Sequence, residues 1–174
     1  MLAEAYRLLS VLGGLELEPE HLLHEALVWR YRACLAVAFR LLGIRHPPKT
    51  MQLVYRNLDA TTKSVRANAL EVADNLLSKD ESRLLLPLIE DRPAEEKVRV
   101  GQSLFAFDIL PPDQCLRALL DDRHAWVVTC AMHLVGERRL GGLQDRVKAR
   151  MEAQDPVVRE TAGWALGRLI ESRA

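Results

Sequence analysis

A short motif that recurs at nearly even spacing limits most strongly what this chain can fold into. Val-Arg dipeptides begin at Val65, Val98 and Val158, and Val127 marks a weaker copy in which valine replaces the arginine. The four marks are separated by 33, 29 and 31 positions (98 − 65, 127 − 98 and 158 − 127). A period of about 30 residues is the length of one helical hairpin, and repeated hairpins stack into α-solenoids. The spacing therefore predicts an all-α fold.

The composition agrees with helix packing. Of the 174 residues, 49% are apolar but only 5% are aromatic, so the core must consist of Leu, Val and Ala. Sheets recruit β-branched and aromatic side chains, whereas such a composition favours helices. The length suffices for one domain, or for about five hairpins of this size.

Charge and cysteine content narrow the expected location and partners. The 24 basic and 24 acidic residues cancel, which gives no global attraction to nucleic acid or membranes. Three distant cysteines indicate a reducing compartment rather than a disulfide framework. The first residues lack the layout of a signal peptide, and no apolar run reaches about 18 residues. We expect a soluble, cytoplasmic chain.

Helical periodicity and helix-stop residues give the expected element order. Gly13-Gly14 is predicted to stop the first helix, and prolines at junctions are expected to start helices, as a missing N–H costs nothing in the first turn. Residues 1–59 are expected to form an N-terminal helical subdomain or divergent capping hairpins, and residues 60–174 about three and a half repeats. The expected helices are 3–12, 18–42, 48–58, 64–77, 81–89, 93–105, 113–120, 125–135, 143–153 and 156–170.

Two local expectations concern burial and capping. Ser64 is expected to cap the first repeat helix. In 26–42 only Arg30, Arg32 and Arg40 interrupt the apolar residues, so this helix needs cover on more than one side, either within the subdomain or in an interface. The repeat positions expected to face inward are Val65, Ala69, Val72, Ala73, Val98, Phe105 and Ile109.

The best copy of the motif resembles a known repeat family. Asp155-Pro156-Val157-Val158-Arg159, followed by Ala162, Ala165, Leu166 and Gly167, is similar to the D-x-x-V-R and A-x-x-A-L-G pattern of the HEAT superfamily, in the variant named for phycobilisome lyases. The resemblance covers about residues 60–174 and implies a right-handed solenoid of HEAT-like hairpins. It also implies that Arg66, Arg99, Asp155 and Arg159 tie neighbouring helix starts together and are structural.

A second resemblance is shorter. Residues 66–77 (RANALEVADNLL) with 84–91 (LLLPLIED) are similar to soluble HEAT regions of bacterial transporters of the nucleotide-translocase and major-facilitator type. It implies a regulatory domain on the cytoplasmic side of a membrane transporter, carried by a larger protein.

The candidate catalytic and metal-binding patterns are weak. His21 and His24 stand three apart, a spacing that can bind one metal, but no further ligand follows nearby. Cys130 and His133 are also three apart, and His133 takes the position of Trp164 in the repeat alignment. Neither glycine pair follows a strand, as a phosphate loop would. The sequence predicts a chain with no catalytic, cofactor-binding or metal-binding residues, and therefore no enzyme.

Charge is distributed unevenly along the chain. Residues 26–58 contain six basic residues and no acid, residues 71–96 contain eight acids, and a basic stretch begins at Arg138. Such blocks bias partner choice and orientation more than they stabilise a fold.

These features favour a protein-binding scaffold whose partner is another protein or another domain of its own chain. The expected contact residues are Arg83, Arg117, Arg146 and Arg150 on the second helices, with Trp126 and Trp164 as aromatic anchors. Two alternatives stay open. One is a nucleic-acid binder similar to HEAT-like DNA glycosylases, against which the neutral charge speaks. The other is an accessory enzyme subunit such as a bilin lyase partner.

Overall fold

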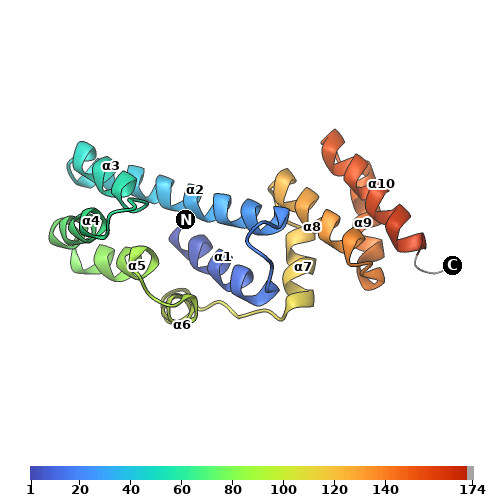
Figure 1. Ribbon diagram of the computed structural model, residues 1–174, viewed down its shortest axis with the longest axis horizontal. Helices are drawn as coiled ribbons and strands as arrows, with labels where there is room; N and C mark the ends of the chain where they lie inside the picture. Colours follow the sequence, from blue (N-terminus) through green and yellow to red (C-terminus); the bar gives the residue numbers. More distant parts are fainter. Residues whose placement is uncertain (172–174) are drawn as a thin grey trace. The chain divides into compact units, whose positions relative to one another are not determined.

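The computed structural model describes residues 1–171, and these residues contain helices and no strand. The predicted all-α class is confirmed (Figure 1). The α-helices are α1 (Leu2–Leu15), α2 (Leu22–Arg45), α3 (Pro48–Asn57), α4 (Lys63–Leu76), α5 (Lys79–Ile89), α6 (Ala94–Phe105), α7 (Pro112–Leu120), α8 (Ala125–Glu137), α9 (Gln144–Ala149) and α10 (Pro156–Glu171). Two 3-10 turns, Gly141–Leu143 and Arg150–Glu152, flank α9.

Proline sets several helix starts where the sequence predicted them. Pro48, Pro112 and Pro156 are the first residues of α3, α7 and α10, and Pro93 immediately precedes α6. Two predicted details of helix ends were wrong. Helix α1 continues through Gly13-Gly14, and the chain turns at Glu16, which adopts a positive φ of 46°. Thr62, and not Ser64, precedes α4, without a capping hydrogen bond from its side chain.

The described chain divides into two compact units. Unit 1 comprises Met1–Gly13 and Trp29–Ile109, and unit 2 comprises Gly14–Val28 and Leu110 onward. Helix α2 therefore supplies its first turns to unit 2 and the rest to unit 1. Unit 1 combines residues from both sides of the predicted boundary at 59/60, which was drawn from the repeat motif alone.

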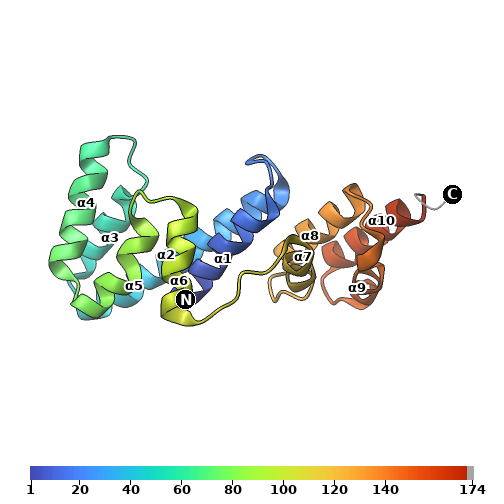
Figure 2. The same ribbon diagram turned by 90° about the horizontal axis from the view of Figure 1, so that it is seen from below.

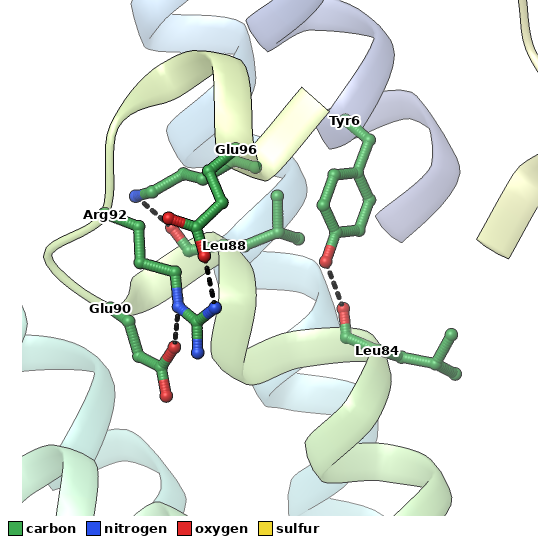
Figure 3. A network of polar contacts seen from close by, with 7 residues as sticks. Tyr6, Leu84, Leu88, Glu90, Arg92 and Glu96 are labelled. Carbon is green, nitrogen blue, oxygen red and sulfur yellow. Dashed lines mark hydrogen bonds and ion pairs between the residues drawn. The ribbon is translucent and has the colours of Figure 1, made fainter. Parts of the chain in front are cut away.

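Polar side chains of unit 1 reach the backbone of α5. The Tyr6 and Tyr31 hydroxyls donate hydrogen bonds to the carbonyls of Leu84 (3.1 Å) and Leu88 (2.9 Å), respectively, and Lys97 Nζ also donates to Leu88 O (2.9 Å). Figure 3 shows the hydrogen bond between Tyr6 and Leu84. Carbonyls in the last turn of a helix lack partners within the helix, so Leu88 O is open to such donors.

The glycine in α6 allows α1 to approach. A Cβ on Gly101 would lie 2.5 Å from Cδ1 of Tyr6, a distance that no real side chain tolerates. The Tyr6 ring also packs against Phe105, with ring centroids 5.7 Å apart. Tyr6 is fully buried as a result, and burial raises its pKa to about 12.

The end of α2 is tied to the start of α5 within the same unit. Glu81 accepts a hydrogen bond from Ser78 N in a capping box, and its carboxylate lies 2.9 Å from His46 Nε2 and 3.2 Å from Arg45 Nη1. The Ser78 backbone hydrogen bond is the main cause that lowers the pKa of Glu81 to about 2. A basic helix end thus meets an acidic helix start, where both helix dipoles favour the pair.

Unit 2 is built around an apolar helix. Nine of the thirteen residues of α8 are buried, among them Met132 and Leu134. Helix α8 packs against α7 and α10, and α9 packs against α7 and α10 (Figure 1, Figure 2). Gly136 lets α10 approach closely, because a Cβ there would lie 2.6 Å from the Trp164 ring and 3.0 Å from Ala165 Cα.

Several predicted inward positions are confirmed and others are wrong. Ala69, Ala73 and Val98 are buried, and Phe105 is half-buried against Tyr6. Val65, Val72 and Ile109 are exposed, because the buried stripe of α4 is narrow and Ile109 follows the end of α6. The apolar region 26–42 is not covered all round by the described residues, since Trp29 and Leu41 are exposed.

Candidate functional site

The two tryptophans of unit 2 are exposed. Trp126 is 50% exposed although most of its helix, α8, is buried, and Trp164 on α10 is 42% exposed. Trp126, His133 and Glu137 are the side chains of α8 that remain accessible beyond its first residue, and positions i, i+7 and i+11 share one helix face. We call Trp126, His133, Glu137 and Trp164 the tryptophan face.

Three members of the tryptophan face contact one another. The rings of His133 and Trp164 stack in parallel, with centroids 4.7 Å apart and planes 4° apart. Glu137 lies 3.9 Å from His133 Nδ1 and 3.2 Å from Nε2 of His21. Among the described residues, His133 Nδ1 is buried without a hydrogen-bond partner. His133 and Trp164 thus form a stacked pair of rings beside a carboxylate.

The arginines predicted to contact a partner in unit 2 are already engaged in the fold. Arg146 and Arg150 both bind the carboxylate of Asp121, and Arg150 Nε also donates to Leu120 O at 2.9 Å, at the end of α7. Arg117 lies 4.0 Å from Asp113 on the same helix. These contacts leave less free positive charge for an acidic ligand than the sequence suggests. Arg83, in unit 1, is exposed and forms no ion pair with any residue of 1–171.

The residues predicted to be structural mostly contact helix starts. Asp155 accepts hydrogen bonds from Val157 N (2.8 Å) and Val158 N (3.3 Å) at the start of α10, which an N-terminal capping residue does. Arg159 donates to the carbonyls of Ala153 and Gln154, just before its own helix. Arg66 lies 3.3 Å from Asp91. Arg99 is exposed and has no ion pair among the described residues.

Sequence reasoning missed a groove between α2 and α3 in unit 1. The groove encloses about 360 Å³, with an apolar floor that includes Phe39, Pro48 and Tyr55 and a polar rim of Arg40, Gln52 and Arg56. Phe39 and Tyr55 pack with ring centroids 5.4 Å apart. The acid-free stretch 26–58 was the signal that could have located it, because it contains every residue of the lining.

The residues of the Cys130–His133 and His21–His24 pairs are surrounded by contacts that belong to the fold. Cys130 is buried, and this burial raises the pKa of its thiol to about 11, the opposite of what a nucleophile needs. His21 Nδ1 accepts a hydrogen bond from Leu23 N (3.0 Å), and His24 Nδ1 lies 3.1 Å from Pro19 O. No cluster of three metal-ligating side chains occurs among residues 1–171. The prediction that the chain is not an enzyme stays a prediction.

Comparison with known proteins returned no match to any family model, curated protein or solved structure. The resemblance to HEAT repeats therefore rests on the sequence motif alone. None of the helices in the described part of the chain combines the length and apolar character needed to cross a bilayer.

Proposed function

We propose that this chain is a non-catalytic α-solenoid of HEAT-like hairpins that binds another protein through the tryptophan face of unit 2. The single observation that carries the proposal is the exposure of Trp126, on a helix that is otherwise almost entirely buried, together with that of Trp164, whose ring stacks on His133 of the same helix. Tryptophan is enriched among the residues that dominate binding energy at protein interfaces. Rings that are already held, as Trp164 is by His133, lose little side-chain freedom on binding.

The repeat part of the proposal is supported by the packing order in unit 2. The first helices of successive hairpins, α8 and α10, are neighbours, and so are the second helices, α7 and α9. Stacked hairpins place equivalent helices side by side in this way. His133 and Trp164 occupy equivalent positions, since both lie six residues after the motif valine (133 − 127 and 164 − 158), and they contact each other.

In the proposal the partner is another protein or another domain of the same polypeptide. Its more specific form places the chain on the cytoplasmic side of a bacterial membrane transporter. Nucleic acid fits less well, because three of the arginines on the second helices face acidic residues of the chain itself.

Site-specific photocrosslinking tests this function. A photoreactive benzoylphenylalanine replaces Trp126 in one variant and Trp29 in another, since Trp29 is equally exposed (59%) but belongs to unit 1. We expect a discrete protein crosslink in cells from position 126 and not from position 29. With that protein purified, Trp126→Ala should weaken binding by about tenfold or more, the effect of losing an interface anchor.

Two results would contradict the proposal. One is the same crosslinking pattern from both positions, which would mean that position 126 contacts proteins only at random. The other is unchanged affinity of Trp126→Ala for the crosslinked protein. Circular dichroism of each variant would establish that its helices are intact.

A further inference from the structure

The basic residues of the segment 26–58 fall into two sets. Arg30, Arg32 and Arg45 each face an acidic partner from outside the segment, at 2.6 Å (Glu4), 3.7 Å (Asp59) and 3.2 Å (Glu81). The second set has no ion pair with any residue of 1–171 and consists of Arg40, Lys49 and Arg56. All three side chains of the second set are exposed.

Two of these unpaired cations lie at the α2–α3 groove. Arg40 and Arg56 belong to its rim, on α2 and α3 respectively. Because the connection between the two helices consists of only His46 and Pro47, α3 begins close to the end of α2. The result is two positive charges at one opening, with no acidic residue in 26–58 to neutralise them.

The floor of the groove limits what can occupy it. Phe39 is only 3% exposed and closes the base of the groove, so the partly exposed ring of Tyr55 is the aromatic surface that an inserted side chain can reach. A volume of 360 Å³ is at the lower end of the roughly 300–1,000 Å³ of ligand pockets. It therefore suits one or two side chains better than a large cofactor.

We propose that the α2–α3 groove binds an acidic segment of a partner protein, which inserts an apolar or aromatic side chain against Tyr55. Carboxylates on either side of the inserted residue pair with Arg40 and Arg56. Guanidinium groups bind carboxylates through two parallel hydrogen bonds, so the contact is directional as well as attractive. The groove lies in unit 1 and shares no residue with the tryptophan face, so either site can fail without the other.

Fluorescence anisotropy with a designed probe tests the groove. The probe is a fluorescein-labelled short peptide with one central phenylalanine flanked on both sides by glutamates and aspartates, and it is titrated with the full chain at low salt. We expect saturable binding that Arg40→Glu and Arg56→Glu each weaken by about tenfold, as loss of a close interfacial charge pair does. Arg99→Glu is the matched control, because it makes the same charge change at another exposed arginine of unit 1 and should change binding less than about twofold.

A second peptide separates the contribution of the apolar floor from that of the charged rim, and vesicles test another occupant. Replacing the central phenylalanine of the peptide by serine should weaken binding, whereas a purely electrostatic site would not distinguish the two peptides. Vesicles of phosphatidylserine and phosphatidylcholine test a membrane surface as the occupant.

The proposal is overturned by any of three results. These are no saturable peptide binding, equal losses for Arg99→Glu and Arg40→Glu, or binding to vesicles that depends on Arg40 while the peptide does not bind. Helix content measured by circular dichroism should be the same in all three variants, because the substituted side chains are exposed.

Discussion

The two units of this chain differ in their polar contacts. In unit 1, two part-buried tyrosine hydroxyls and a half-buried lysine bind carbonyls of α5, so polar groups connect helices that are distant in sequence. In unit 2, α8 buries an almost purely apolar set of residues, and the polar contacts, such as Arg146 and Arg150 with Asp121, lie at the surface. We therefore expect the stability of unit 1 to depend on these hydrogen bonds and on pH in addition to its apolar core, and the stability of unit 2 to depend on apolar packing and, weakly, on salt.

The acceptors of these hydrogen bonds lie in the C-terminal half of α5. The donors from α1, α2 and α6 bind the carbonyls of Leu84 and Leu88. Pro87 also lies inside this helix and supplies no N–H to the carbonyl of Arg83, whereas α8 contains no proline.

We expect the largest loss of stability when a buried side chain of α8 is shortened. Leu134 is fully buried, and Leu134→Ala should lower the free energy of unfolding of unit 2 by about 3 kcal/mol through lost burial and a cavity. Hydrogen exchange measured by mass spectrometry should show faster exchange in peptides from 110–171. Leu85→Ala is the counterpart in unit 1 and should act on peptides from 29–109. A Leu134→Ala variant as stable as the wild type would refute the apolar account of unit 2.

The next effect concerns glycines at close helix contacts. Gly101→Ala should destabilise unit 1 by about 1 to 2 kcal/mol, because overlap with the Tyr6 ring exceeds the roughly 1 kcal/mol gained in helix propensity. Gly13→Ala, with nothing within 4 Å of its new Cβ, should instead stabilise by up to about 1 kcal/mol. In unit 2, Gly136→Ala should likewise destabilise, because its Cβ would overlap the Trp164 ring. Gly167→Ala, with nothing within 4 Å of its Cβ, should stabilise. Thermal unfolding measures all four, and equal signs within either pair would contradict the packing.

A smaller effect tests the tyrosine contacts. Tyr31→Phe should cost about 1 kcal/mol, the usual net value of one hydrogen bond. Burial raises the pKa of Tyr6 and of Tyr31 from 10.0 to about 12, so their stabilisation is complete below pH 10 and is lost as pH rises from 10 through 12.

Urea unfolding at pH 8 and pH 11 measures this dependence. The Tyr6→Phe, Tyr31→Phe double variant should lose less stability between these two pH values than the wild type. If the wild type and the double variant lose the same amount, the two phenols do not carry the alkaline sensitivity of unit 1.

The smallest effect is expected at the surface of unit 2. Asp121→Asn removes the acceptor charge of Arg146 and Arg150 and should cost about 0.5 to 1 kcal/mol, as exposed ion pairs do. The loss should shrink in urea unfolding at high salt, because ions screen exposed charges. Asp113→Asn, which affects only the longer contact with Arg117, should have almost no effect. A salt-independent loss at Asp121 would mean that hydrogen-bond geometry and not charge dominates this site.

Much of the secondary structure was predictable because its signals are local. The prolines at the starts of α3, α6, α7 and α10 and the apolar periodicity placed most helices to within a few residues. The extension of α1 past Gly13-Gly14 was missed, because glycine permits a helix end without requiring one.

The candidate sites were less predictable because they depend on distant residues. The sequence singled out Trp126 and Trp164 but not the stacking of His133 on Trp164, which requires α10 to lie against Gly136. It also suggested Arg146 and Arg150 as free, although Asp121, more than twenty positions upstream, holds both. For the groove between α2 and α3, the sequence offered only the absence of acidic residues from 26–58.

The amino-acid sequence by itself determined that this chain is helical, where most of its helices begin, and that its basic and acidic residues are segregated, because these properties depend on neighbours in the chain. Only the tertiary structure decided which basic side chains form ion pairs, which tryptophan stacks on a neighbouring ring and where a groove lies. A charge or a ring is free or engaged according to what packs beside it, and those neighbours come from other helices.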